Sequence, residues 1–244
     1  MHRFFIPPEQ ISAGQVTITG DTARQIHSVL RLHNGAHITV LDDSGLEYRV
    51  ELETVERSSA LGWVLESQPG LAEPRTRLTV YLGLTQREKF EYALQKCTEA
   101  GAAGFVPFIS SRTLLQDPAE AAKKILRWQQ IVQEAAEQSG RGRIPTVQAP
   151  LRYPEALADA AARHAHCFLL WEGEHATSLR SALAGEPPAN PLAVSGVENA
   201  VFSSFIPPGL LVNGANLVAV EVHQASADSS DLSFDLALVA TANQ

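Results

Sequence analysis

Apolar residues in the segment 128–139, WQQIVQEAAEQS, recur at three- and four-residue spacing. This spacing predicts an amphipathic helix with one buried face. The residues on that face are Trp128, Ile131, Val132, Ala135 and Ala136. Gly140 is expected to end the helix, before the charged loop Gly140–Arg143. Two interpretations of this loop stay open: a site for an anionic ligand, or a solvated helix end with cations near its negative terminus.

The pattern of the first 67 residues predicts a small β-rich module. Residues 15–19 alternate between apolar and polar positions, and residues 37–55 predict two strands joined by a turn at Asp43–Gly45. Between them, residues 21–32 predict a short helix that Asp21 can cap.

Basic side chains gather in and before that short helix. They are Arg3, Arg24, His27 and Arg31. The cluster is either a solvated face or a patch that contacts phosphates.

The segment 68–76 contains two prolines and is predicted to be a domain linker. After it the pattern of apolar and polar residues changes. Apolar runs predict strands at 78–83, 105–110, 167–171 and 191–194. Helices are predicted between them, at 88–101, 128–139 and 175–183. This alternation predicts an α/β domain with a parallel sheet covered by helices on both faces.

Ligands of such sheets bind beyond the carboxyl ends of the strands, so the candidate site residues lie on loops. They are Thr85, Gln86 and Arg87 after the first strand, Ser110, Ser111 and Arg112 after the second, Glu172 and Gly173 after the third, and the residues after Val194. The chain contains no Walker loop, GxGxxG, GxSxG or HExxH motif. His164 and His166 lie two residues apart, but without a third ligand nearby they predict no metal site.

The distribution of charge argues against a protein that coats nucleic acid non-specifically. The net charge is -8, and all 19 Lys and Arg residues lie at or before Arg180. Two cysteines, no signal peptide at the start and no apolar run of membrane-spanning length predict a cytoplasmic protein without a membrane segment.

Several segments in order along residues 1–194 carry a family resemblance. They read HRFFI, HSVLRLHNG, QREKFEYALQKCTEAGAAGFVPFISSRT, RWQQIVQEAAEQSGRGRIP and LLWEGEHATSL. Together they resemble the family of ribosomal RNA small subunit methyltransferase E. That family transfers a methyl group from S-adenosylmethionine to N3 of a uridine in 16S ribosomal RNA.

The resemblance implies a fold, a cofactor and partners. Residues 1–70 would form a PUA-like RNA-binding β-barrel, and residues 75–194 a SPOUT-class parallel-sheet domain with a trefoil knot. S-adenosyl-L-methionine would be the cofactor, 16S ribosomal RNA or the small ribosomal subunit the substrate, and a homodimer the assembly.

Residues 195–244 depart from the family pattern. The segment Gly196–Ala200 stands where the family has a Gly-Pro-Glu-Gly-Gly loop. Residues 216–224 and 231–240 alternate with period two, which predicts β-strands, and they resemble the last strands of a β-sandwich. The alternative function is therefore an RNA-binding protein that has lost catalysis, or a fusion or frameshift relic of the family.

The resemblance and the loop positions together give a set of predicted site residues. The predicted RNA contacts are Arg3, His27, Arg31 and Arg112. The residues predicted near the reaction centre, to neutralise the uracil anion or a phosphate, are Arg87, Gln138 and Arg141. The predicted cofactor contacts are Leu170, Trp171, Glu172 and Gly196.

Overall fold

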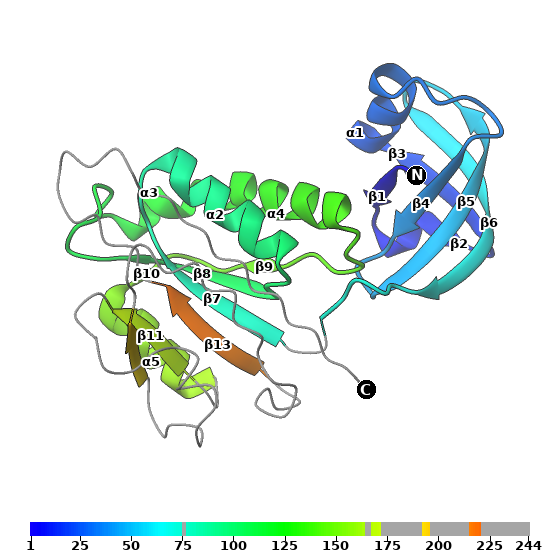
Figure 1. Ribbon diagram of the computed structural model, residues 1–244. Helices are drawn as coiled ribbons and strands as arrows, with labels where there is room; N and C mark the ends of the chain where they lie inside the picture. The colour runs from blue at the N-terminus through cyan, green and yellow to red at the C-terminus, as the bar shows by residue number, and fades with distance from the viewer. Residues whose placement is uncertain (75–76, 164–166, 172–191, 196–214, 221–244) are drawn as a thin grey trace. The chain divides into compact units, whose positions relative to one another are not determined.

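The computed structural model describes residues 1–74, 77–163, 167–171, 192–195 and 215–220 (Figure 1). The chain divides into two compact units. Unit 1 comprises Met1–Glu73 and Ala136–Ile144, and unit 2 comprises Pro74–Ala135 and Pro145–Gln244. The chain therefore passes between the units three times, after Glu73, after Ala135 and after Ile144.

Unit 1 contains a six-stranded sheet in the order β1-β4-β5-β6-β3-β2. Its strands are β1 (Arg3–Phe5), β2 (Ile11–Ser12), β3 (Gln15–Thr19), β4 (His37–Leu41), β5 (Leu46–Val55) and β6 (Ser59–Pro69). Neighbouring strands are antiparallel, except that β1 and β4 are parallel. The two strands predicted around the Asp43–Gly45 turn are confirmed as β4 and β5. Gly45 has φ 93°, a conformation that glycine adopts without strain.

The core of unit 1 forms where the sheet meets a short helical segment, α1 (Gly20–Arg24) followed by one π-helical turn, η2 (Gln25–Val29). Ala23 and Ile26 from this segment pack with sheet residues such as Ile38 and Val50. The predicted cap is wrong. The helix begins at Gly20, so Asp21 already lies in its first turn and pairs with Arg24 at 2.9 Å, while Thr19 is the N-cap.

The sheet of unit 2 is entirely parallel, as the sequence predicts, in the order β10-β8-β7-β13-β11-β12, with β9 paired to β8. Its strands are β7 (Arg77–Gly83), β8 (Gly104–Ile109), β9 (Thr146–Val147), β10 (Leu151–Arg152), β11 (Cys167–Trp171), β12 (Leu192–Ser195) and β13 (Ala215–Val220). The four predicted strands are confirmed as β7, β8, β11 and β12. Strand β8 is buried along its whole length, which explains its unbroken apolar run.

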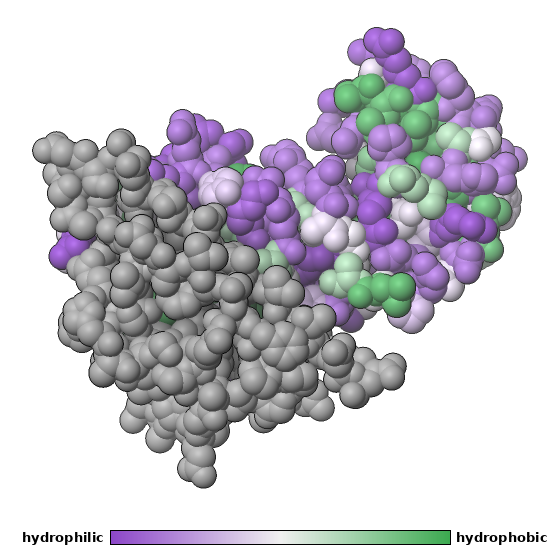
Figure 2. All heavy atoms as spheres, viewed as in Figure 1, coloured by the Kyte–Doolittle hydropathy of each residue, from purple (hydrophilic) through white to green (hydrophobic). Residues whose placement is uncertain are grey.

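Helices lie on both faces of this sheet (Figure 1). On one face are α2 (Arg87–Glu99), the short α3 (Pro118–Ala122) and α4 (Ile125–Ser139), and on the other is α5 (Tyr153–Arg163). The buried face predicted for α4 is confirmed at four of its five residues, Ile131 being only partly buried, and the rings of Phe90 of α2 and Trp128 of α4 meet with centroids 4.8 Å apart. Their outer faces are mainly hydrophilic (Figure 2).

Helix α5 is not predicted by the sequence pattern. It packs Ala156 and Ala160 onto the sheet, and the Tyr81 hydroxyl donates to Asp159 Oδ2 at 2.6 Å. The segment is amphipathic, with Ala156 and Ala160 on its buried side, but the sequence analysis placed no helix there.

Strand β13 comes from the segment that departs from the family pattern. The prediction of a strand there is confirmed for Ala215–Val220, but the strand pairs in parallel with β7 and β11 inside the sheet of unit 2. The expected strand at 231–240 and helix at 175–183 lie outside the described residues. Among the residues that the structure describes, no helix is both long and apolar enough to cross a membrane.

Candidate functional site

The carboxyl ends of the unit 2 strands meet at one edge of the sheet. The register aligns Leu82 of β7 with Val220 of β13, and Val220 with Leu170 of β11. Trp171, the last residue of β11, pairs with Ser195, the last residue of β12. Because the strands are parallel, the loops that follow all of them leave the sheet at this edge.

The loop after β8 is held by a compact hydrogen-bond turn. The Ser110 amide donates to Thr113 Oγ1 at 3.0 Å, and the Arg112 amide donates to Ser110 Oγ at 3.3 Å. The Gln116 side-chain amide donates to the carbonyls of Ser110 and Thr113. Thr113 is buried and Arg112 is exposed, so the turn gives the backbone around Arg112 a defined course at the sheet edge.

The first helical residue after β7, Arg87, belongs to a charged cluster that joins α2 and α4. Its Nε donates to Glu91 Oε1 at 3.0 Å, and Arg127 reaches the same carboxylate with Nε and Nη2, both at 2.7 Å. The hydrogen bonds from Arg127 in particular lower the pKa of Glu91 to about 2. Glu91 is therefore a carboxylate across the physiological range and keeps two guanidinium groups close together.

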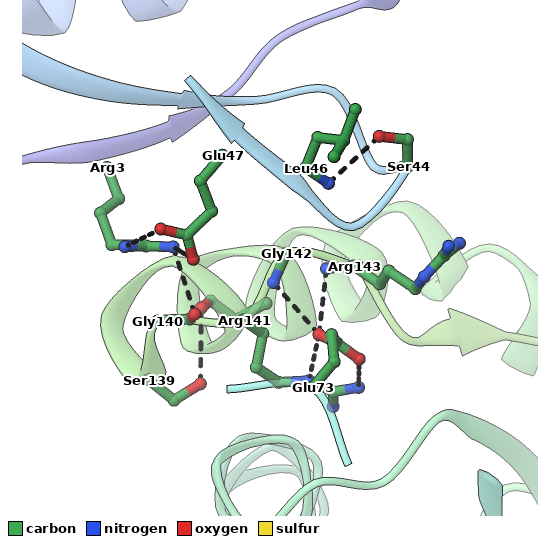
Figure 3. A network of polar contacts seen from close by, with 11 residues as sticks. Arg3, Ser44, Leu46, Glu47, Glu73, Ser139, Gly140, Arg141, Gly142 and Arg143 are labelled. Carbon is green, nitrogen blue, oxygen red and sulfur yellow. Dashed lines mark hydrogen bonds and ion pairs between the residues drawn. The ribbon is translucent and has the colours of Figure 1, made fainter. Parts of the chain in front are cut away.

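In unit 1, the end of α4 and the loop after it form a second polar centre (Figure 3). Gly140 ends the helix as predicted, with φ 77°. The Arg141 amide donates to the Ala136 carbonyl at 2.9 Å and the Gly140 amide to the Glu137 carbonyl at 3.4 Å, the two bonds of a Schellman motif.

The carboxylate of Glu73 is the centre of the contacts in Figure 3. It accepts from Arg141 Nε at 3.2 Å and Nη2 at 3.1 Å, and from the amides of Gly142 and Arg143, each at 3.1 Å. The Arg141 side chain is only 3% exposed. Arg141 is thus part of a buried ion pair within unit 1.

Other acids of unit 1 complete the network. Glu47 pairs with Arg3 at 2.5 Å, and Arg3 also donates to the Gly140 carbonyl at 3.2 Å. Glu137 accepts from the Phe5 amide at 3.0 Å, and Asp43 accepts from the Ile144 amide at 2.6 Å. Arg141 and Arg3 are therefore each paired with a carboxylate of the same unit.

Comparison with known proteins identifies the family. Residues 72–200 match the family model described as an RNA methyltransferase domain, which is more than half of the chain. The chain is 36% identical over 160 residues to ribosomal RNA small subunit methyltransferase E of Synechocystis, an alignment that covers 66% of this chain and 51% of the relative. The chain belongs to the ribosomal RNA small subunit methyltransferase E family.

A second curated member, from Bacillus subtilis, is 35% identical over 151 residues, covering 60% of this chain and 59% of that protein. The chain thus spans between half and three fifths of the length of these two curated relatives. The crystal structure of the methyltransferase E of Neisseria gonorrhoeae bound to S-adenosyl methionine has a TM-score of 0.69 and 26% identity to this chain. That match covers 91% of this chain and 89% of the other.

In this methyltransferase E family member, the predicted site residues fall into separate groups. At the sheet edge of unit 2 lie Leu170, Trp171, Arg87 and Arg112. In unit 1, around the end of α4, lie Gln138, which is exposed, and the paired Arg3 and Arg141. On the helical segment of unit 1 lies His27, and just after that segment lies Arg31; both are exposed. Glu172 and Gly196 lie outside the described residues, directly after Trp171 and Ser195.

Arg87 and Arg141, predicted together near the reaction centre, therefore belong to different units. Their environments differ as well, because the Arg87 side chain is 65% exposed and that of Arg141 is buried.

Sequence reasoning missed the acids that hold these arginines. Glu73 lies in the predicted linker, and Glu91 and Arg127 are 36 residues apart in sequence. The Gly-Arg-Gly-Arg sequence of the loop was a weak indication of a bound carboxylate, because it places unshielded backbone amides beside guanidinium groups.

The two cysteines offer no nucleophile. Cys97 and Cys167 are buried, and burial raises the pKa of both thiols, that of Cys97 to about 12. Within the described ranges, no group of three His, Cys, Asp or Glu side chains could hold a metal ion.

Proposed function

We propose that this chain is an S-adenosylmethionine-dependent methyltransferase that methylates N3 of a uridine in 16S ribosomal RNA. The observation that carries the proposal is the shared carboxyl edge of β11 and β12, where Trp171 pairs with Ser195, in a chain of this family. The name of the family supports a small-subunit ribosomal RNA substrate, and the bound ligand of the gonococcal relative supports the cofactor.

The residues at this edge fit such a cofactor. Leu170 is buried, and the ladder between β11 and β12 ends at Trp171 and Ser195. The apolar residues with which β11 ends suit the adenine ring of such a cofactor. S-adenosylmethionine supplies an electrophilic methyl group there. We propose Leu170, Trp171, Glu172 and Gly196 as the cofactor contacts.

Methylation of uridine N3 requires removal of its proton, which leaves negative charge on the ring. We propose that Arg87 stabilises this charge, because its guanidinium is exposed near the sheet edge and is oriented by Glu91. Gln138, with an exposed amide, stays a proposed contact to the base or its neighbours. The protein must also hold the uracil base in line with the methyl donor, turned out of the base stack of the RNA.

Unit 1 is proposed to be a PUA-like RNA-binding barrel, and unit 2 a SPOUT-class domain with a trefoil knot. The strand order of unit 1 and the insertion of β13 between β7 and β11 support these assignments. His27, Arg31 and Arg112 are proposed RNA contacts, because their side chains are exposed. For Arg3 and Arg141 we propose a positioning role instead, since carboxylates hold both guanidinium groups and the side chains are only 22% and 3% exposed, against 65% for Arg87. A homodimer that acts in the cytoplasm follows from the family resemblance.

The test combines cofactor binding with product analysis. Calorimetric titration of the whole protein with S-adenosylmethionine is expected to give micromolar affinity. Methyl transfer to 16S ribosomal RNA from a strain lacking N3-methyluridine is expected, with the product located by mass spectrometry. Absence of transfer to that RNA would overturn the proposal.

One observation favours the second candidate, an RNA-binding protein without catalysis. The family's glycine-rich loop is replaced here by Gly196-Val197-Glu198-Asn199-Ala200, which puts side chains where close backbone approach is expected. Salt-dependent RNA binding by a protein that takes up no S-adenosylmethionine would establish this alternative.

A further inference from the structure

We propose that Glu73 is a positioning residue for methyl transfer, through the loop at the end of α4. This inference rests on the proposed function, because it concerns the rate of that reaction. It assigns a role to a carboxylate whose side chain binds the buried Arg141 guanidinium.

The first argument is the number and kind of its contacts. A single carboxylate accepts four hydrogen bonds, two from the Arg141 guanidinium and two from the backbone amides of Gly142 and Arg143. Bonds to backbone amides fix the course of the chain itself. Charge-assisted bonds of this kind are roughly twice as strong as neutral ones.

The second argument is where those contacts lie along the chain. Glu73 is the last residue of unit 1 before the chain first leaves it, and residues 141–143 lie in the short stretch Ala136–Ile144 by which the chain visits unit 1 again. The Glu73–Arg141 pair thus links the residue at which the chain first leaves unit 1 to the stretch in which the chain returns to it. Both lie within residues 72–200, the stretch that matches the RNA methyltransferase domain.

The third argument is the close packing of this loop on the β4–β5 turn. A Cβ on Gly142 would lie 3.1 Å from Gly45 Cα, and the Gly45 amide donates to the Gly142 carbonyl at 3.2 Å. This closely packed loop directly follows α4, whose first eleven residues belong to unit 2. Glu73 therefore fixes the last turn of a helix that both units share, including the exposed Gln138.

Gln138, on the last turn of α4, is exposed and is a proposed contact to the base or its neighbours. Misplacement by about 1 Å can cost roughly a hundredfold in rate even when binding is intact. Loosening the end of α4 is therefore expected to lower turnover without weakening either binding step.

The experiment measures kcat and KM for RNA, together with the separate dissociation constants for RNA and S-adenosylmethionine. For Glu73→Gln we expect kcat to fall by about tenfold or more, with both dissociation constants within about twofold of wild type. Glu73→Asp, which keeps the charge, is expected to recover part of the lost kcat. The matched control is Glu66→Gln, which removes an exposed carboxylate 3.6 Å from Arg49 in the same unit and is expected to leave all four quantities unchanged.

A second variant guards against loss of folding. Glu73→Gln combined with Arg141→Met removes both charges, so no buried guanidinium is left unpaired, and it is expected to fold yet keep the low kcat. A folded variant with wild-type kcat would overturn the inference, and so would a loss of activity explained entirely by weaker binding. A wild-type protein that transfers no methyl group would overturn the proposed function and this inference with it, whereas an active wild type with an equally active Glu73→Gln variant would overturn the inference alone.

Discussion

The Arg127 guanidinium of α4 donates two hydrogen bonds to the Glu91 carboxylate of α2, both 2.7 Å long. Arg87 adds a third bond to the same carboxylate from the first turn of α2. The Glu91 side chain is only 16% exposed, while the two arginines are more than half exposed. The cluster therefore ties the two helices together beside the aromatic contact of Phe90 and Trp128 and sets the direction of Arg87 at the sheet edge.

This cluster predicts a particular pH dependence of stability. The pKa of Glu91 is lowered to about 2, so its stabilisation is complete above the ordinary value of about 4.5 and is lost as the pH falls toward 2. We expect Glu91→Gln to reduce the free energy of unfolding at pH 7 by about 1 to 2 kcal/mol, a figure lowered for solvent screening of the exposed arginines. The difference between the two proteins should shrink to near zero at pH 2.

Denaturation curves measured from pH 7 to pH 2 would check this. Glu99→Gln, which removes the exposed partner of Lys96 on the same helix, is the control and should stay within about 0.5 kcal/mol of wild type. A Glu91→Gln difference that is the same at pH 7 and pH 2 would contradict the assignment.

Substitutions at Gly140 can distinguish the cost of backbone strain from the cost of steric crowding. A Cβ at this position would have Ala72 Cβ, at 3.9 Å, as its nearest neighbour, so there is room for a side chain. The φ of 77° still disfavours alanine, and Gly140→Ala is expected to cost about 1 kcal/mol of stability. Asparagine tolerates this conformation better, so Gly140→Asn should cost less. Urea unfolding of both variants measures the difference, and equal losses would mean that strain is not the cause.

Thr113 tests the turn after β8. Thr113→Val keeps the shape but removes the oxygen that accepts from the Ser110 amide, leaving a partly buried N–H without its partner at a cost of about 1 to 2 kcal/mol. Hydrogen exchange at Ser110 should accelerate in this variant. Thr85→Val changes an exposed threonine after the neighbouring strand and should leave exchange at Ser110 unchanged. Protection of Ser110 that survives Thr113→Val would show that another group holds the turn.

Period and composition predicted most of the strands and the buried face of α4, because burial on one face leaves a regular apolar pattern in the sequence. Helix α5 was not predicted, although its segment is amphipathic with Ala156 and Ala160 on the buried side. The pairing of Glu73 with Arg141 was out of reach for a different reason: a hydrogen bond between residues 68 positions apart leaves no periodic trace. The topology alone predicted that the candidate site residues lie on loops at the strand ends. The environment of each arginine could not be predicted, because it depends on which carboxylate the fold brings next to it.

Arg31 offers the most direct test of RNA binding by unit 1. Its side chain is exposed, and its backbone has φ 52°, an uncommon conformation for a residue other than glycine that fixes where the side chain begins. Arg31→Ala should keep the fold, because alanine adopts this conformation at a similar cost to arginine. If Arg31 contacts a phosphate, the variant should bind 16S ribosomal RNA several-fold more weakly, and the slope of log K against log salt concentration should fall in magnitude by about 0.7 to 0.9.

Arg57→Ala, at an exposed position between β5 and β6, is the control and should change neither quantity. Weaker binding with an unchanged slope would mean that Arg31 acts through something other than phosphate charge.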